Sequence, residues 1–197
     1  MLPNLLAFVL FAVAASATPG PNNALLAASA AAHGVRRTVP QVFGIALGFG
    51  AMVAIVGLGL SGPLGASPAL HGALRWVGGA WMLWIAYGIA RSAVSSDAPP
   101  RPPMGLAAAA LFQCVNPKAW VLAVAATTTY TASSNPMVPQ VLTLAGVFAL
   151  VGLPCSLLWA CIGAGAARVL QTPRQLRAFN VAMAALLAVS VLPLLAP

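Results

Sequence analysis

The first apolar run of the sequence extends from Pro3 to about His33, and a polar segment interrupts it part-way along. That segment, residues 18–23, reads Thr-Pro-Gly-Pro-Asn-Asn where a membrane helix would normally have leucine or valine. Proline removes a backbone donor and clashes with the carbonyl four residues earlier, so a helix must kink or break here. Broken backbone at membrane depth is tolerated only where protein buries it or where it lines a watery cavity. The segment therefore predicts a binding site.

Charged residues are scarce along the whole chain. Only 5% of the 197 residues are charged, 61% are apolar, and Asp97 is the one acid, whereas about a quarter of the residues in a soluble domain are charged. This predicts an integral membrane protein. The net charge of +8 does not indicate nucleic acid, because the arginines stand singly or in pairs between apolar runs and form no basic face. Residues 1–17 lack the basic start of a signal peptide, so we expect no cleavage.

Apolar runs of roughly 20 residues, long enough to cross a membrane, occur six times. We predict an all-α integral membrane protein with six transmembrane helices, of which the first and fourth are interrupted. Asn116-Pro117-Lys118 interrupts the fourth. Gly44 and Gly48 in the second either allow close approach of another helix or reflect only how common glycine is in membrane helices. Residues 91–103, rich in proline, predict a linker. The six predicted spans are Pro3–His33, Val39–Leu60, Leu70–Ala90, Met104–Tyr130, Val138–Gly163 and Ala178–Leu195.

Basic residues predict the orientation of these spans. The connections after spans one, three and five together contain seven arginines, whereas Arg75 stands alone on the other side and Lys118 lies inside a span. Because Lys and Arg favour the cytoplasmic side, we predict that these three connections are cytoplasmic and that both termini lie outside. The seven residues are Arg36, Arg37, Arg91, Arg101, Arg168, Arg174 and Arg177.

The two interruptions occupy equivalent places in two halves of the chain. Pro19 and Pro117 lie 98 residues apart, and each half begins with a broken span that two unbroken spans follow. Because each half has three spans, an odd number, the halves enter the membrane in opposite senses. We therefore predict one transmembrane transporter domain, residues 1–197, built from two inverted three-helix repeats of about 1–97 and 98–197. Interruptions at corresponding places in such repeats indicate a substrate site near the bilayer midplane.

A broken helix offers groups of both signs. Its first half ends in free carbonyls, a partly negative end, and its second half begins with free N–H groups, a partly positive end. A zwitterionic amino acid has an ammonium for the carbonyls and a carboxylate for the N–H groups. Two alternatives remain: Asn22 and Asn23 cap the broken backbone locally, and Lys118 either snorkels or binds the carbonyls that Pro117 frees. The predicted substrate-binding residues are Thr18, Pro19, Gly20, Pro21, Asn22, Asn23, Gln113, Asn116, Pro117 and Lys118.

The residues that are missing restrict the cargo. No acid lies in any predicted span, so no carboxylate there could pair with the side chain of a lysine or arginine substrate. Hard cations likewise lack oxygen ligands. We expect a neutral or zwitterionic substrate, no metal and no cofactor. A charged group inside the membrane is costly and marks function by default, and Lys118 is the only titratable candidate for proton coupling near a break.

Several segments together resemble the LysE/RhtB family of amino-acid exporters, and the resemblance covers the whole chain in order. It implies a small efflux carrier of the bacterial inner membrane, working as a homodimer and driven by protons, that exports amino acids or close derivatives and is not an enzyme. The neutral-substrate members, and the cysteine/O-acetylserine exporters among them, are the most similar. The matching segments are residues 18–23, His33-Gly34 with Arg36-Arg37, Gly44 to Gly48, Leu74–Gly79 with Trp84-Ile85-Ala86, and Phe112–Trp120.

Three other functions are less consistent with the sequence than export. A membrane thiol-redox or electron carrier of the same superfamily would need paired cysteines, but Cys155 and Cys161 are six positions apart, about 240° around a helix, and do not share a face. A metal-efflux carrier would need a His-rich loop, and His33 and His71 alone do not form one. A non-transporting scaffold leaves the matched breaks unexplained. We read the cysteines, Cys114 included, as small packing residues.

Overall fold

The computed structural model describes residues 4–59, 68–92, 102–132, 134–170 and 172–192, and side chains are described for all of these except 68–75 and 92. The described residues are helical, with short connections and no strand. In chain order the elements are α1 (Leu5–Ala17), α2 (Pro21–His33), α3 (Val35–Gly57), α5 (Pro68–Ser92), α6 (Leu106–Leu111), the 3-10 helix η1 (Phe112–Val115), α7 (Pro117–Tyr130), α8 (Met137–Val169) and α9 (Pro173–Val189).

Both predicted interruptions are present as bends between two helices. The axes of α1 and α2 differ by 51°, and those of the α6–η1 unit and α7 differ by 74°. Pro21 and Pro117 each occupy the first turn of the helix that follows the break, where the missing N–H of proline costs no hydrogen bond. Among the described residues, α3 and α8 are long and apolar enough to cross a membrane alone, and the count is four if each bent pair is one span. The fold is thus that of an all-α membrane protein, while the six-span count stays a prediction.

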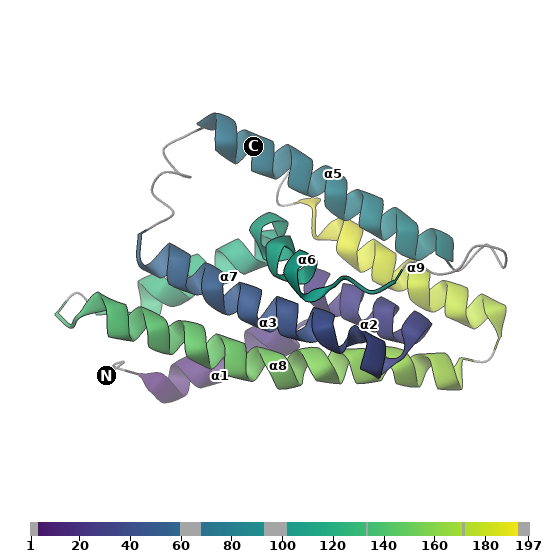
Figure 1. The fold of residues 1–197 in the computed structure, drawn as a ribbon, viewed down its shortest axis with the longest axis horizontal. Helices are drawn as coiled ribbons and strands as arrows, with labels where there is room; N and C mark the ends of the chain where they lie inside the picture. The colour runs from purple at the N-terminus through teal and green to yellow at the C-terminus, as the bar shows by residue number, and fades with distance from the viewer. Residues whose placement is uncertain (1–3, 60–67, 93–101, 133, 171, 193–197) are drawn as a thin grey trace.

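Helix α8 is the central packing element. It lies along α1, α2 and α3, whereas α5 and α9 form a separate pair that contacts the rest mainly through α2 and η1 (Figure 1). Small residues allow the close approaches: a Cβ at Gly163 of α8 would lie 2.6 Å from the carbonyl carbon of Ala27 in α2. The predicted close approach at Gly44 and Gly48 is confirmed, because a Cβ at either position would clash with the backbone of α6.

An aromatic cluster fills one half of the bundle. Phe148 of α8 packs edge-on against Phe49 of α3 at a ring-centroid distance of 4.8 Å and against Phe8 of α1 at 5.2 Å. Tyr130, at the end of α7, lies 5.1 Å from Phe8 and 5.6 Å from Phe11. Such tilted and edge-on pairs contribute about 0.5–1.5 kcal/mol each beyond their buried area. The cluster therefore joins α1, α3, α7 and α8 firmly at the end of the bundle where α1 begins.

Apolar side chains also cover much of the outside. On α5, Trp76, Trp84 and Tyr87 are all more than half exposed, as are Leu6 of α1 and Leu150 of α8. An exposed apolar surface of this extent is typical of a protein that contacts lipid. The predicted linker 91–103 falls mostly outside the described residues, because 93–101 are not described.

Basic side chains gather at one end of this apolar bundle. The starts of α3 and α9 and the ends of α5 and α8 lie at the same end of the molecule, opposite the start of α1 (Figure 1). We call this the arginine end. The arginines at those helix termini are Arg36, Arg37, Arg91, Arg168, Arg174 and Arg177, while the side chains of Arg75 and Arg101 lie outside the described part.

Candidate functional site

The first break is held in shape by its own asparagine. The backbone turns out of α1 at Thr18 and is extended at Gly20 before α2 begins. The Asn23 side-chain amide donates to the carbonyls of Ser16 at 3.0 Å and Thr18 at 2.9 Å. The Thr18 hydroxyl donates back to the Ala14 carbonyl of its own helix. Asn23 therefore has the local capping role that the sequence left as an alternative, and it fixes the angle at which α2 leaves the break.

The second break is capped in a different way. Asn116 is the N-cap of α7, and its side-chain oxygen accepts a hydrogen bond from the Lys118 backbone N–H at 3.1 Å. The carbonyl of Cys114, in η1, accepts a hydrogen bond from the Trp120 indole at 2.9 Å. The groups that Pro117 leaves without helical partners are thus partly satisfied by nearby side chains, as broken helices in membranes require.

Three side-chain amides join the two breaks. Asn22 Nδ2 donates to Gln113 Oε1 at 2.9 Å, and Gln113 Nε2 donates back to Asn22 Oδ1 at 3.2 Å. Asn116 Nδ2 also donates to Asn22 Oδ1, at 3.1 Å. Asn22 is 91 positions from Gln113 and 94 from Asn116, so these bonds exist only because the fold brings the breaks together. We call these three residues the amide cluster.

Lys118 forms a second link between the breaks. Its Nζ donates to the carbonyl of Thr18 at 2.8 Å and is 3.4 Å from that of Pro19. A cation at the C-terminal end of a helix interacts favourably with the helix dipole, and here the cation comes from the other half of the chain. Gly20 leaves the space for it, since a Cβ there would lie 2.9 Å from Lys118 Cδ and 3.1 Å from Nζ.

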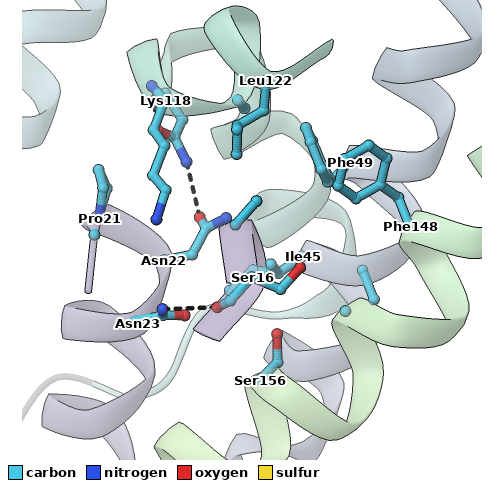
Figure 2. Close-up of a pocket in the computed structure, with 16 residues that line it drawn as sticks. Ser16, Pro21, Asn22, Asn23, Ile45, Phe49, Lys118, Leu122, Phe148 and Ser156 are labelled. Atoms are coloured by element: carbon cyan, nitrogen blue, oxygen red, sulfur yellow. Dashed lines mark hydrogen bonds between the residues drawn. The ribbon is translucent and has the colours of Figure 1, made fainter. Parts of the chain in front are cut away.

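A cavity of about 50 Å³ lies between the breaks, enough for roughly three to five waters. One wall consists of the polar groups of the breaks, and Phe49, Phe148 and Leu122 form the other (Figure 2). Of the predicted site residues, Thr18, Pro19, Gln113 and Pro117 do not line it, although the first three bond to residues that do. Those that line it are Gly20, Pro21, Asn22, Asn23, Asn116 and Lys118.

Sequence reasoning missed the cavity residues that lie on unbroken helices or before the break. Ser156 of α8 is 5% exposed and its hydroxyl points toward the cavity (Figure 2). Ser16, two positions before the first break, also lines the cavity, as does Ile45 of α3. Only Ser16 had a usable signal, its nearness to the break, because a serine or isoleucine in an apolar helix does not reveal which side it faces.

The electrostatics of the site differ from the expectation in one respect. Free carbonyls at the end of α1 were expected, but those of Ser16, Ala17, Thr18 and Pro19 all accept hydrogen bonds, from Asn23, Trp159 and Lys118. The start of α2 is open by contrast, because its N-cap supplies no side-chain hydrogen bond. An uncapped helix start is a favourable place for an anion.

A second cavity, of about 330 Å³, lies between α2 and α5 toward the arginine end. Leu25, Ile85 and Met104 contribute apolar walls, and Ser29 and His33 of α2 contribute the polar atoms. His33 is also in the last turn of α2, the helix-end position expected from the sequence. This cavity is larger than the one at the breaks but contains none of the predicted site residues.

Metal-binding and cysteine chemistry find no further support in the described part of the chain. No group of three or more His, Cys, Asp or Glu residues there could hold a metal ion. The three cysteines are free, and Cys114 and Cys161 are exposed. We read all three as small packing residues, but the exposed Cys114 and Cys161 are not packed among the described side chains of this chain.

An apolar helical bundle in which two broken helices meet at a polar cavity is an arrangement typical of membrane transporters. The chain belongs to the LysE type translocator family, whose match covers residues 13–195. It is 33% identical to the cysteine/O-acetylserine efflux protein of Escherichia coli (strain K12). The alignment spans 165 residues, which are 83% of this chain and 84% of that protein. The protein of the same description from Salmonella typhimurium (strain LT2) is 32% identical over the same shares. No solved structure matches the chain significantly.

Proposed function

We propose that this protein exports small neutral amino acids or close derivatives across the cytoplasmic membrane, with the two breaks as the substrate site. The observation that supports this best is the hydrogen bond from Lys118 Nζ to the Thr18 carbonyl. It shows an ammonium group bound at the end of α1, which is the interaction a substrate ammonium would make. The efflux of cysteine and O-acetylserine named for the relatives agrees with a neutral cargo.

Substrate binding follows from this arrangement as an exchange of partners. The substrate ammonium replaces the Lys118 ammonium on the carbonyls of Thr18 and Pro19. The freed Lys118 and the open start of α2 then receive the carboxylate. The amide cluster holds the two breaks together while this happens, because its bonds do not involve those carbonyls. After this exchange the substrate ammonium contacts the carbonyls and its carboxylate contacts the Lys118 ammonium, so each charged group has a partner.

The substrate side chain occupies the rest of the cavity. Phe49, Phe148 and Leu122 give that region apolar walls, and the Ser156 hydroxyl adds one hydrogen-bonding group. No described lining residue is acidic, so a lysine or arginine side chain would be buried there without a partner, which is costly. Small side chains that are apolar or carry a hydroxyl, thiol or ester match this lining.

Alternating access and proton coupling complete the proposal. We propose six spans arranged as two inverted repeats, with the arginine end in the cytoplasm, and a homodimer as the working assembly. The aromatic cluster then lies between the cavity and the outside, so opening the exit requires Phe49 and Phe148 to separate. Protonation and deprotonation of Lys118 provide the coupling, since a neutral amine would bind the Thr18 carbonyl more weakly than the ammonium does.

Export is tested with purified protein in proteoliposomes and a panel of labelled amino acids. We expect a pH gradient to drive transport of cysteine, O-acetylserine and serine, but not of lysine or arginine. Empty liposomes and liposomes treated with a protonophore are the controls. If the protein is correctly inserted and moves no amino acid, the proposed function is wrong. If transport persists at full rate after the proton gradient is collapsed, only the coupling is wrong.

A further inference from the structure

The long helices α3 and α8 each contain a buried glutamine, Gln41 and Gln140. Only Gln140 has an evident structural role. Gln140, in the first turns of α8, is 3% exposed. Its Oε1 accepts from the Ala132 N–H at 2.9 Å, and its Nε2 donates to the Ala132 carbonyl at 2.9 Å and to the Asn135 and Pro136 carbonyls at 3.2 Å each. Gln140 therefore fastens the connection between α7 and α8.

Gln41 of α3 is also buried, but within the described part of the chain its side-chain amide is not hydrogen-bonded as that of Gln140 is. It is 0% exposed, and among the described residues neither Oε1 nor Nε2 has a hydrogen-bond partner. Burying an amide without partners is unfavourable, because the group loses its bonds to water and gains none. An apolar side chain of the same size would leave the folded state better satisfied. Packing in this state thus gives no reason for an amide at position 41.

The position of Gln41 connects it with the substrate site. Gln41, Ile45 and Phe49 are four residues apart along α3 and share one face of the helix, and Ile45 and Phe49 both line the cavity between the breaks. Gln41 is about one turn, roughly 6 Å along the axis at 1.5 Å per residue, further toward the start of α3 than Ile45. That direction leads from the cavity to the arginine end, and the next buried residue on this side, Thr38, bonds to the Gly34 carbonyl.

We infer that Gln41 is a hydrogen-bonding residue for the transported solute, one helical turn from the cavity on the path toward the arginine end. This inference rests on the proposed function. A primary amide suits a zwitterion, because Nε2 donates to a carboxylate and Oε1 accepts from an ammonium. Because the amide has no charge, it binds the zwitterion weakly enough to release it again. The amide is unpaired in this state because its partner arrives only during transport.

The two glutamines provide a matched test, with Gln41→Met and Gln140→Met as the variants. Methionine keeps the volume and the unbranched shape and removes the amide. We expect Gln41→Met to melt in detergent at or above the wild-type temperature and to transport labelled O-acetylserine and cysteine at least tenfold more slowly in proteoliposomes. Gln140→Met should melt lower, because it loses satisfied bonds, and should transport at close to the wild-type rate per folded molecule.

Gln41→Asn tests whether the amide itself matters, and it should recover part of the lost transport. The inference is overturned if Gln41→Met transports at the wild-type rate, or if it melts well below the wild type, since the amide would then serve folding. It is also overturned if Gln41→Asn, when folded, is no better than Gln41→Met. Absence of transport by the wild-type protein would instead overturn the proposed function, which separates the two failures.

Discussion

The Nζ of Lys118 lies 2.8 Å from the carbonyl oxygen of Thr18, a residue 100 positions earlier in the chain. The second broken helix therefore supplies the cation that completes the first. Since the amide cluster joins the same two breaks at Asn22 and Asn116, neither break is a complete site by itself.

Replacing Lys118 with methionine should stop pH-driven export. The change removes a hydrogen bond between a charged donor and the Thr18 carbonyl, an interaction of about 1.5–3 kcal/mol, and removes the group proposed to bind the carboxylate. We expect the rate in proteoliposomes to fall at least tenfold, while Lys118→Arg, which keeps the charge, retains part of it. Export by Lys118→Met that still follows the pH gradient at the wild-type rate would show that Lys118 neither binds substrate nor carries the proton.

Adding one methyl group at Gly20 should disturb the same contact from the other side. The new Cβ would lie 2.9 Å from Lys118 Cδ. Because the flexible lysine can move aside, Gly20→Ala should still fold. Its export rate should fall by roughly tenfold if a contact of about 1.4 kcal/mol is lost. Gly146→Ala is the control, because a Cβ there meets nothing within 4 Å. Equal export by the two variants would contradict the spatial role given to Gly20.

Gly163→Ala should affect stability and not the site chemistry. Its Cβ would meet backbone atoms of Ala27, including the carbonyl carbon at 2.6 Å, and neither helix backbone can move as a side chain can. Overpacking of this kind costs about 1–3 kcal/mol or more, so we expect a clear drop in melting temperature in detergent. Gly165→Ala, two positions on and in open space, should melt like the wild type. A melting temperature unchanged in Gly163→Ala would mean that α2 and α8 are further apart than described.

Ser156→Ala should change selectivity more than the overall rate. The hydroxyl faces the part of the cavity proposed for the substrate side chain, and a neutral hydrogen bond contributes about 1 kcal/mol. We expect about fivefold weaker transport of serine and cysteine relative to alanine. Ser190→Ala is the comparison, since that hydroxyl bonds to the Leu186 carbonyl within α9 and lies elsewhere in the bundle. An identical ratio of serine transport to alanine transport in both variants would show that Ser156 does not contact the substrate.

The breaks could be predicted from the sequence because their signals are local. Proline clustered with glycine and asparagine in an apolar run disfavours an unbroken helix, and both predicted interruptions are bends in the structure. Single prolines are weaker signals, since Pro40 of α3 and Pro154 of α8 stand inside continuous helices. That the two breaks meet was expected from the equivalent places of Pro19 and Pro117 in the two halves, but the particular pairing of Asn22 with Gln113 and Asn116 was not. Such reasoning needed no knowledge of packing.

The remaining part of the site depends on how the helices rotate against one another. Ser156 and Phe148 lie in an apolar helix, and the side of α8 that faces the cavity is decided by close contacts such as Gly163 against Ala27. That information is spread over two helices far apart in the chain. The occupied carbonyls of α1 were missed for a related reason, because Lys118 reaches them only across the finished fold.

The unequal capping of the two breaks has one further consequence. Asn116 already accepts the Lys118 backbone N–H at the start of α7, whereas the start of α2 has no side-chain cap. Two repeats with equal ends would accept a zwitterion in either of two antiparallel poses. Here only the start of α2 lacks a side-chain cap, so the proposed site would hold its solute in a single pose, with the carboxylate toward α2.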